Sequence, residues 1–266
     1  MRRVAHLSDL HFGRIEPGSL EVLRRRLEAL SPDLLLISGD LTQRARPEEF
    51  REARAYLDTL PRPQLVVPGN HDVPLYNLFR RFFRPLADYQ RFISQDLEPQ
   101  YVDAEIAAVG VNTARSLVFK GGRINEAQVA EVRRKICRLG DEVTKVLVTH
   151  HPFDVPRQDG AQTVGRARMA LRRLADCGID VLVAGHLHAS HVGMTGSSVL
   201  VVQAGTATSR RTRAEPNAFN LLRVEPRHIE VDRYLLRGSD FVRGATDSFD
   251  RAAGGWEHSR PSYAAA

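Results

Sequence analysis

The sequence predicts an α/β domain, and three observations lead to this class. Short runs of Val, Ile and Leu recur along the chain at strand length, and amphipathic stretches of helical length lie between them. Polar residues of metal-ligand type directly follow five of the runs. With 266 residues, 42% of them hydrophobic and 26% charged, the chain has the composition of a globular protein with one large core, in one domain or at most two.

The predicted strands are short, rich in β-branched residues and leucine, and mostly apolar throughout. Such runs are typical of strands that are covered on both faces, as in the sheets of α/β proteins. In chain order the predicted strands are residues 4–7, 34–37, 65–67, 106–111, 146–148, 181–184 and 199–202.

The predicted helices lie between these strands and carry apolar residues at helical spacing. Four amphipathic helices are expected at residues 20–30, 47–60, 126–139 and 166–177. Pro47 stands where a first-turn proline is favoured. The segment of residues 77–93 is also expected to be helical, except that Pro85 must end or kink it.

We expect one folded domain over residues 1–237. Beyond about Leu236 the periodic pattern is lost, and the chain is rich in small and polar residues with scattered aromatic ones. Residues 238–266 are therefore expected to form a flexible or loosely docked tail.

Composition argues against several classes of protein. The two cysteines, Cys137 and Cys177, are far apart in sequence, so neither a disulfide framework nor a thiolate metal site is expected. No run approaches the ~20 apolar residues that span a bilayer, and the N-terminus lacks an apolar secretory segment, so we expect a soluble cytoplasmic protein. The net charge of +6 is scattered over several helices, which favours a solvated arginine-rich surface over a dedicated site for nucleic acid or membranes.

Polar residues recur at one structural place, the end of a predicted strand. The segments are LSDLH, ISGD, VPGNHD, VTHH and VAGHLH, which start at residues 7, 37, 67, 148 and 183. A single segment of this kind is explained well enough by a polar turn that closes a strand. Five of them favour one shared site, because the carboxyl ends of strands in an α/β sheet gather at one crevice.

Glycine precedes the polar residue in three of these segments, at Gly39, Gly69 and Gly185. A residue without Cβ permits a sharp turn that directs the next side chain back over the strand end. The glycines thus support the same shared site.

The candidate ligands combine imidazole with carboxylate and amide oxygen. This mixture suits zinc, manganese, iron, cobalt or nickel, with iron and manganese favoured, whereas an all-oxygen cage would indicate magnesium or calcium. The set is too large for one ion and suits two divalent ions that share a carboxylate. Two such ions with two aspartates and a bridging hydroxide leave a net charge of about +1, which attracts a phosphate ester. The candidates are Asp9, His11, Asp40, Asn70, His71, His150, His151, His186 and His188.

The order D-x-H, G-D, G-N-H-D, H and G-H-x-H resembles the pattern of the calcineurin-like metallophosphoesterases. The resemblance runs from Asp9 to His188 and includes the specific segments LSDLHFG and SGDLT. It implies a β-sandwich flanked by helices, in a four-layer α/β/β/α order, with a dinuclear metal centre at one edge.

The resemblance also implies a role for each motif residue. Asp40 would bridge the two ions, and a metal-activated hydroxide would attack phosphorus in line. His71, which is not a ligand in the family, would bind the phosphate beside Asn70 and either donate a proton to the leaving oxygen or stabilise the developing charge. One ion would be bound by Asp9, His11, Asp40 and His188, and the other by Asp40, Asn70, His150 and His186.

Three further polar residues are expected to support the site without binding metal. Asp72 is expected to orient His71 or its loop. His151 is expected outside the ligand set, because successive side chains on an extended segment point apart. His6, within the first strand, is expected to be a hydrogen-bonded core histidine.

Within the superfamily, the segment GDLT differs from the GDYVDRG of Ser/Thr protein phosphatases. SGDLTQRARPEEF, PGNHDVP and AGHLH look like bacterial class III cyclic nucleotide phosphodiesterases and their glycerophosphodiesterase relatives. The resemblance therefore implies a phosphodiesterase acting on a small diester, first of all a 3′,5′-cyclic nucleotide. Asn112 and Thr113 follow a predicted strand and either touch substrate at the rim or form a simple turn.

The segment from Phe79 to Arg91 leaves the specificity open. Its phenylalanines share one helical face, so the helix either packs them on the domain or forms a cap that grips a lipid or a nucleobase. A lipid cap would indicate a pyrophosphatase on a nucleotide-linked lipid of the UDP-diacylglucosamine type, and a phosphate track of arginines would indicate a nuclease. A non-enzymatic binding module is disfavoured because every motif position is present. Nothing marks an interface, so monomer and homodimer are both compatible with the sequence.

Overall fold

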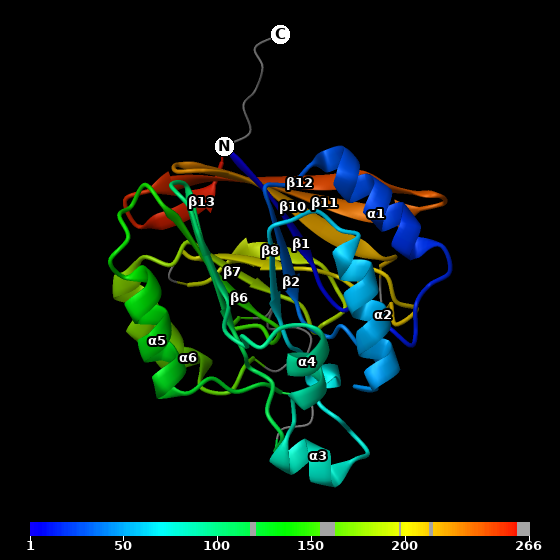
Figure 1. The fold of residues 1–266 in the computed structure, drawn as a ribbon. Helices are drawn as coiled ribbons and strands as arrows, with labels where there is room; N and C mark the ends of the chain where they lie inside the picture. The colour runs from blue at the N-terminus through cyan, green and yellow to red at the C-terminus, as the bar shows by residue number, and fades with distance from the viewer. Residues whose placement is uncertain (118–120, 155–162, 197, 213–214, 260–266) are drawn as a thin grey trace.

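The computed structural model describes residues 1–117, 121–154, 163–196, 198–212 and 215–259. These residues form two β-sheets that pack face to face, with helices against the outer face of each sheet (Figure 1). The α/β class and the four-layer α/β/β/α order are therefore confirmed.

The first sheet has seven strands in the order β13-β12-β11-β10-β1-β2-β3. Three strands, β1 to β3, run parallel, and β10 to β13 extend the sheet as an antiparallel meander. The bounds are β1 Arg2–Leu7, β2 Leu34–Ser38, β3 Gln64–Val67, β10 Ala218–Glu225, β11 His228–Arg237, β12 Asp240–Ala252 and β13 Gly255–His258.

The second sheet has six strands in the order β4-β5-β6-β7-β9-β8. Its four central strands are parallel, and the edge strands β4 and β8 are antiparallel to their neighbours. The bounds are β4 Gln100–Val102, β5 Ile106–Val111, β6 Thr144–Thr149, β7 Val181–Ala184, β8 His191–Met194 and β9 Leu200–Gln203.

Helices α1 and α2 cover the first sheet, α5 and α6 cover the second, and α3 and α4 lie together at one end of the molecule (Figure 1). In the described part of the chain, no helix has the length and apolar character needed to cross a bilayer. The bounds are α1 Ser19–Leu30, α2 Pro47–Asp58, α3 Leu78–Phe83, α4 Ala87–Phe92, α5 Glu126–Ile136 and α6 Ala167–Leu174, with short 3₁₀ turns at η1 Asn70–Asp72 and η2 Ala175–Cys177.

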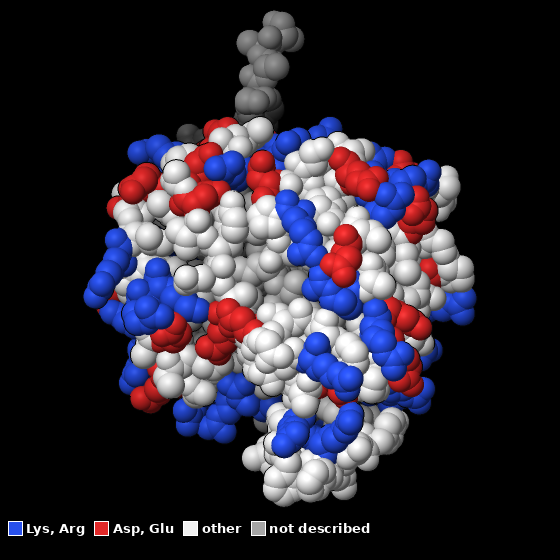
Figure 2. Space-filling model, viewed as in Figure 1, with Lys and Arg blue, Asp and Glu red and all other residues white. Residues whose placement is uncertain are grey.

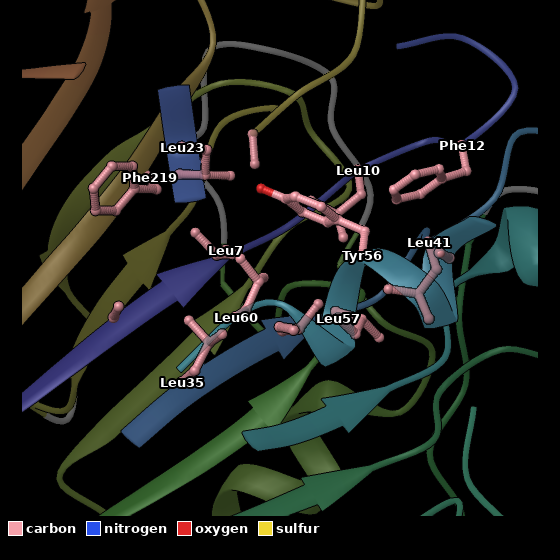
Figure 3. Close-up of a cluster of buried hydrophobic side chains, with 14 of the residues drawn as sticks. Leu7, Leu10, Phe12, Leu23, Leu35, Leu41, Tyr56, Leu57, Leu60 and Phe219 are labelled. Atoms are coloured by element: carbon pink, nitrogen blue, oxygen red, sulfur yellow. The ribbon is translucent and has the colours of Figure 1, made fainter. Parts of the chain in front are cut away.

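Side chains of the central strands alternate between two cores, which explains why their runs are apolar throughout. In β2, Leu34 and Leu36 face the second sheet, whereas Leu35 and Ile37 face α1 and α2. The outer core beneath the helices also holds Tyr56, whose hydroxyl donates to a backbone carbonyl of α1 at 2.8 Å (Figure 3).

All seven predicted strands and all four predicted amphipathic helices are present, with bounds that differ by at most three residues. The proline at residue 85 separates α3 from α4, as expected. Several strands were not predicted, namely β4, β8 and β10 to β13. They are edge or antiparallel strands, and most of them mix polar with apolar residues because solvent reaches part of them.

The prediction of a flexible tail from residue 238 is wrong for most of its length. Strands β12 and β13 complete the first sheet. Phe249 and Trp256 are buried between the two sheets, and Nε1–H of Trp256 donates to Asp180 at 3.0 Å. Residues 242–246 of β12 are all exposed, so β12 is specified by pairing with β11, and β13 by pairing with β12, rather than by their own pattern. Residues 260–266 lie outside the described residues.

Cys137 and Cys177 form a disulfide, which corrects the expectation of none. The two residues are 40 apart in sequence, but α5 and α6 lie side by side on the second sheet and end near the same place (Figure 1). Their Cα atoms are therefore only 4.2 Å apart. Separation along the chain did not reflect separation in space.

His6 is a buried core histidine, as predicted. Its Nε2 lies 2.8 Å from the hydroxyl of Ser38, and no part of the residue is exposed. Burial lowers the pKa of His6 to about 3. The folded protein thus keeps this imidazole neutral at pH values where the unfolded chain protonates it.

This difference predicts acid sensitivity. Between the ordinary histidine pKa of about 6.5 and the folded value near 3, the unfolded chain binds one proton more than the folded protein at this residue. His6 therefore lowers the free energy of unfolding by about 1.4 kcal/mol for each unit by which the pH is decreased within this range. The full contribution is present above pH 6.5. Urea unfolding of His6→Gln protein between pH 7 and pH 4 is expected to show a shallower loss of stability than the unchanged protein, and parallel curves would contradict the assignment.

Candidate metal centre

Five loops meet at one edge of the sandwich, at the carboxyl ends of β1, β2, β3, β6 and β7. Backbone hydrogen bonds tie the loops together, from Asp9 N–H to the carbonyl of Gly39 and from Gly185 N–H to the carbonyl of His150, both at 3.1 Å. The backbone N–H of His186 joins the two sheets by donating to Oδ2 of Asp9 at 3.0 Å. The structure thus brings the five sequence segments together.

Five of the candidate ligands have a left-handed backbone conformation that residues with a side chain rarely adopt. The φ angles are +54° at Asp9, +53° at His11, +54° at Asp40, +73° at His186 and +56° at His188. Each such residue costs roughly 1 kcal/mol or more, and the packing around it must hold the conformation. Strain of this kind is concentrated at functional sites, where it sets the direction of the side chain.

The glycines of the loops are required for two different reasons. Gly39, with φ +89°, makes the sharp turn that we predicted. Gly69 and Gly185 are needed because other groups approach their Cα atoms closely. A Cβ on Gly69 would lie 2.2 Å from Oδ1 of Asp40, and one on Gly185 would lie 1.7 Å from Oγ of Ser8.

A first group of ligand-type side chains consists of Asp9, His11, Asp40 and His188, all of them buried, with their ligand atoms within 4.8 Å of one another. Oδ1 of Asp9 lies 3.1 Å from Nε2 of His188 and 3.5 Å from Nε2 of His11. The two Nε2 atoms are themselves 3.2 Å apart. Three atoms that can each offer a lone pair therefore share one small space.

The partners of these histidines decide which nitrogen faces that space as an acceptor. Nδ1 of His11 lies 3.3 Å from the carbonyl oxygen of Thr42, and Nδ1 of His188 lies 2.7 Å from that of Arg211. A carbonyl only accepts, so each Nδ1 carries the proton and each Nε2 presents a lone pair. Within the described chain, no group donates a hydrogen bond to the buried Oδ1 of Asp9. The converging lone pairs of Asp9, His11 and His188 fit a bound cation.

A second group lies on the other side of Asp40 and adds an amide oxygen. Oδ1 of Asn70 lies 3.0 Å from Nε2 of His150 and 3.0 Å from Nδ1 of His186. Nδ1 of His150 lies 2.8 Å from the carbonyl oxygen of Ser38, so Nε2 is the nitrogen that a cation would meet once it displaces the second proton of the ring. Despite burial, the carboxylate of Asp40 raises the pKa of His150 to about 9, because a positive charge is favoured at this point.

Asp40 links the two groups through one oxygen. Its Oδ2 lies 3.9 Å from Nε2 of His11 and 3.3 Å from Nε2 of His150, while its Oδ1 accepts the backbone N–H of His71 at 2.8 Å. Although burial opposes ionisation, His150 holds the pKa of Asp40 well below its usual range. An ionised carboxylate with one oxygen between two clusters of lone pairs can serve as a bridge between two cations.

His151 lies closer to the second group than we expected. A ring nitrogen of His151 lies within 4.8 Å of ligand nitrogens of His150 and His186, and its ring centroid is 4.8 Å from that of His150. The expected alternation does not apply because β6 ends at Thr149, before both histidines. Nδ1 of His151 is paired with the Thr113 hydroxyl at 2.8 Å, so this ring is held in place from outside the group.

His71 lies beside the first group, and its two ring nitrogens have different partners. Nδ1 is 2.9 Å from the carbonyl oxygen of Gln43, and Nε2 is 2.7 Å from Nη1 of Arg211. A carbonyl only accepts and a guanidinium only donates, so Nδ1 carries the proton and Nε2 accepts. Burial lowers the pKa of His71, in agreement with a neutral ring. Of the two roles expected for His71, this geometry favours stabilisation of charge over proton donation from Nε2.

Arg211 is a site residue that the sequence analysis did not identify. Its guanidinium contacts His71 and its carbonyl accepts from His188, so it connects the first ligand group to His71. It belongs to the segment SRRTR, between β9 and β10 and outside every recognised motif. A cluster of arginines after the last ligand was the one available signal, and it did not distinguish Arg211 from its neighbour Arg210.

Asp72 fixes the turn η1, as predicted. The residue is buried, and its carboxylate accepts backbone N–H groups of Gly69 at 2.9 Å, Leu41 at 3.2 Å and Thr42 at 2.9 Å, together with the Thr42 hydroxyl at 2.9 Å. Burial raises the pKa of Asp72 to about 6. One carboxylate therefore ties the loop after β3 to the loop after β2.

Replacing this carboxylate is expected to damage both stability and metal binding. Asp72→Ala leaves three buried backbone donors unsatisfied, which we expect to lower the free energy of unfolding by about 3 kcal/mol or more. Metal affinity is expected to fall by about 10- to 100-fold because the loop that carries Asn70 loses its anchor. Asp72→Asn keeps one acceptor oxygen and should lose less of both. Urea unfolding and metal titration measure the two effects, and an alanine variant as stable as the unchanged protein would contradict them.

The structure shows Asn112 in the simple-turn arrangement. Its Oδ1 accepts the backbone N–H of Ala114 at 3.0 Å. The residue lines a cavity of about 740 Å³ together with Arg84, Arg91 and Arg115, and none of the candidate metal ligands lines that cavity. Contact between Asn112 and substrate stays a prediction.

Two stacked sheets with a histidine and aspartate cluster at one common edge define the metallophosphoesterase class of folds. Comparison with known families agrees with this assignment. The family described as calcineurin-like phosphoesterase matches residues 2–190, a range that includes every candidate ligand. The chain therefore belongs to the calcineurin-like phosphoesterase family.

Curated relatives carry phosphodiesterase and pyrophosphatase names. A glycerophosphodiester phosphodiesterase of Enterobacter lignolyticus is 29% identical over 162 residues, which are 56% of this chain and 57% of that protein. A probable cyclic nucleotide phosphodiesterase of Rhodococcus erythropolis is 30% identical over 70% of this chain and 65% of its own length. A UDP-2,3-diacylglucosamine pyrophosphatase of Chlamydia trachomatis is 24% identical over 72% of this chain and 65% of its own length. The chain thus spans less than two thirds of these relatives.

A solved structure has the same fold at low sequence identity. The dimetal phosphatase from Danio rerio superposes with a TM-score of 0.68 and 14% identity, over 91% of this chain and 98% of that one. At this identity the likeness concerns the fold alone.

Proposed function

We propose that this chain is a phosphodiester hydrolase that binds two divalent metal ions at the common edge of its sheets. The observation that carries the proposal is the position of Oδ2 of Asp40 between two groups of converging nitrogen and oxygen atoms. Two bound ions supply Lewis acidity to phosphate oxygens and lower the pKa of a coordinated water. In this proposal the first ion is held by Asp9, His11, Asp40 and His188, and the second by Asp40, Asn70, His150 and His186.

The two groups differ in chemistry, and this allows a direct test of the ligand assignment. Manganese and iron are the proposed ions, since both accept mixed imidazole, carboxylate and amide donors. Asn70→Ala and His150→Ala are each expected to bind one ion fewer per chain and to lose most activity. Elemental analysis after loading with Mn²⁺ measures the stoichiometry. Two ions retained in both variants would contradict the second group.

The protein's own side chains are arranged to hold a phosphate group beside the first ligand group. Arg211 carries a planar guanidinium beside His71, with Nη1 2.7 Å from Nε2 of His71, and the pair is partly buried, where charge-assisted hydrogen bonds are strong. We propose that Arg211 contacts a phosphate oxygen and that His71 fixes the guanidinium. In this way His71 assists the leaving group by stabilising charge as it develops.

The proposed substrate is a small phosphodiester, first of all a 3′,5′-cyclic nucleotide. The segment SGDLT and the name of the Rhodococcus relative support the cyclic nucleotide. The name of the Enterobacter relative supports a small diester in general.

Steady-state hydrolysis with added Mn²⁺ tests the proposal on four substrates: 3′,5′-cyclic AMP, an aryl phosphodiester, a nucleotide linked to a lipid by pyrophosphate, and a short single-stranded DNA. The unchanged protein is expected to hydrolyse the cyclic nucleotide and the aryl diester, and Asp40→Asn is expected to hydrolyse neither. A fully metal-loaded protein that turns over none of the four would overturn the proposal.

A second candidate, the lipid-linked pyrophosphate, is favoured by one specific observation. Phe79 and Phe83 of α3 are 71% and 72% exposed, at the end of the molecule that also carries the ligand loops. The name of the Chlamydia relative points to the same substrate class. A row of arginines that binds the phosphates of a nucleic acid, as in a nuclease, is less well supported. Arg81 is buried, and Arg80 is paired with Asp88 at 2.5 Å.

A further inference from the structure

A knob of apolar side chains projects from the end of the molecule that carries the ligand loops. The α3 knob comprises residues 75–83 and the neighbouring Leu117. Tyr76, Phe79, Phe83 and Leu117 are each more than 70% exposed. Figure 1 shows α3 standing out beyond α4, and Figure 2 shows an uncharged protrusion there, with lysine or arginine atoms bordering it where it joins the body. Exposed apolar clusters of this kind mark a binding surface.

Helix α3, at the centre of the knob, buries a charged residue and exposes its apolar ones. Arg81 is its buried residue, and the guanidinium donates to the carbonyls of Ser116 at 2.7 Å and Pro74 at 3.1 Å. Its phenylalanines face solvent instead, and the rings of Phe79 and Phe83 lie 4.8 Å apart. We expected the phenylalanines either to pack on the domain or to form a cap, and the structure excludes the first. The buried arginine holds the knob so that its apolar side faces outward.

A group of arginines lies directly behind the knob. The cavity of about 740 Å³ there is lined by Phe83 together with Arg84, Arg91 and Arg115. Among the described residues, none of these three arginines has a carboxylate within salt-bridge distance, in contrast to Arg80. The surface thus combines an apolar tip with positive charge at its base, which is exposed at Arg84 and Arg91.

We propose that the α3 knob docks on an anionic phospholipid bilayer. Its phenylalanines and leucines would insert at the boundary between headgroups and acyl chains, and the cavity arginines would contact lipid phosphates. The order of the two parts matches the layers of such a membrane. The apolar tip would reach the acyl chains, while the arginines at its base would stay at the level of the anionic headgroups. The convex shape of the tip suits insertion into a deformable surface.

Two other occupants fit the same surface less well. A second copy of the chain would bring two sets of unneutralised arginines toward each other, which disfavours a symmetric contact through the knob. Single-stranded nucleic acid would match the arginines and stack on Phe79 or Phe83, but Leu78 and Leu117 offer nothing for a base to stack on.

Docking would place the candidate metal centre next to the membrane, because η1 is followed within a few residues by α3. This consequence rests on the proposed function and narrows its substrate to a phosphodiester or pyrophosphate carried on a lipid. The docking itself does not rest on it, since a protein without hydrolytic activity would still bind vesicles through the knob.

Vesicle co-sedimentation tests the docking with the full chain. We expect the protein to bind vesicles of phosphatidylcholine and phosphatidylglycerol, to bind pure phosphatidylcholine weakly, and to be released by salt. The double variant Phe79→Ser with Phe83→Ser is expected to bind about 100-fold more weakly. The double variant Arg84→Gln with Arg91→Gln is expected to bind about 30-fold more weakly.

Matched controls separate docking from folding and from hydrolysis. Val242→Ser removes an exposed apolar side chain elsewhere, and Arg25→Gln removes a charge from α1, at the far end of the molecule (Figure 1). Both are expected to bind vesicles like the unchanged protein. Hydrolysis of a soluble aryl phosphodiester should be equal in all variants, which shows that they fold.

Four outcomes would overturn the docking proposal. The first is equal vesicle binding by the phenylalanine variant and the unchanged protein, and the second is no vesicle binding at all. The third is a dimer in analytical ultracentrifugation that the phenylalanine variant converts to a monomer, which would assign the knob to a second copy. Tight single-stranded DNA binding that is lost in the same variant, without vesicle binding, would assign it to nucleic acid.

Discussion

Asp40→Asn protein is expected to bind fewer than two metal ions per chain and to lose roughly 1000-fold or more of its phosphodiester hydrolysis, because metal-ion catalysis contributes several kcal/mol. Asparagine has the shape of aspartate and can still accept the backbone N–H of His71, so the loop should keep its fold. It cannot offer a charged oxygen to both groups at once. Its amide would instead present N–H donors or a neutral oxygen to Nε2 of His11 and His150.

The matched control is Asp58→Asn, an aspartate on the surface of α2 that pairs with Arg54 and Arg62. It should keep both ions and full activity. Thermal unfolding of both variants without metal establishes that they are folded. Two ions retained in Asp40→Asn, with activity within tenfold of the unchanged protein, would show that Asp40 is not the bridge.

Arg211→Met protein is expected to keep both ions but to lose about 100- to 1000-fold in kcat, the usual effect of removing one donor to a developing negative charge. His71→Ala should give a similar loss with both ions retained, because the imidazole acts by fixing the guanidinium. The double variant should therefore be little slower than either single one. The expected signature is a loss in kcat and non-additive effects, measured by steady-state kinetics on metal-saturated protein.

The chain offers a close control for this prediction in Arg210→Met. Arg210 is the preceding residue, but its side chain lies on the surface near Glu16 at 3.5 Å. Its replacement should leave kcat unchanged. Additive losses in the double variant would separate the roles of His71 and Arg211, and loss of a metal ion in His71→Ala would place His71 among the ligands instead.

The sequence by itself determined the central strands and the residues that meet at their ends. Strands such as β2 and β6 are buried on both faces, so their apolar runs are continuous and easily recognised. The candidate ligands directly follow such strands, and the shared geometry of strand ends predicted that they converge. Local sequence was sufficient because both the strand and the turn after it are specified by adjacent residues.

The tertiary structure decided what depends on partners distant in sequence. Strand β12 forms because β11 offers it hydrogen bonds, and only an anchor such as Phe249 marks its buried face. Arg211 joins the site because the segment between β9 and β10 returns to the ligand loops, and no local pattern encodes that return. The phenylalanines of α3 face outward because Arg81 is held by the carbonyls of Pro74 and Ser116, of which Ser116 is 35 residues away in sequence, whereas helical periodicity alone could not show which face is buried.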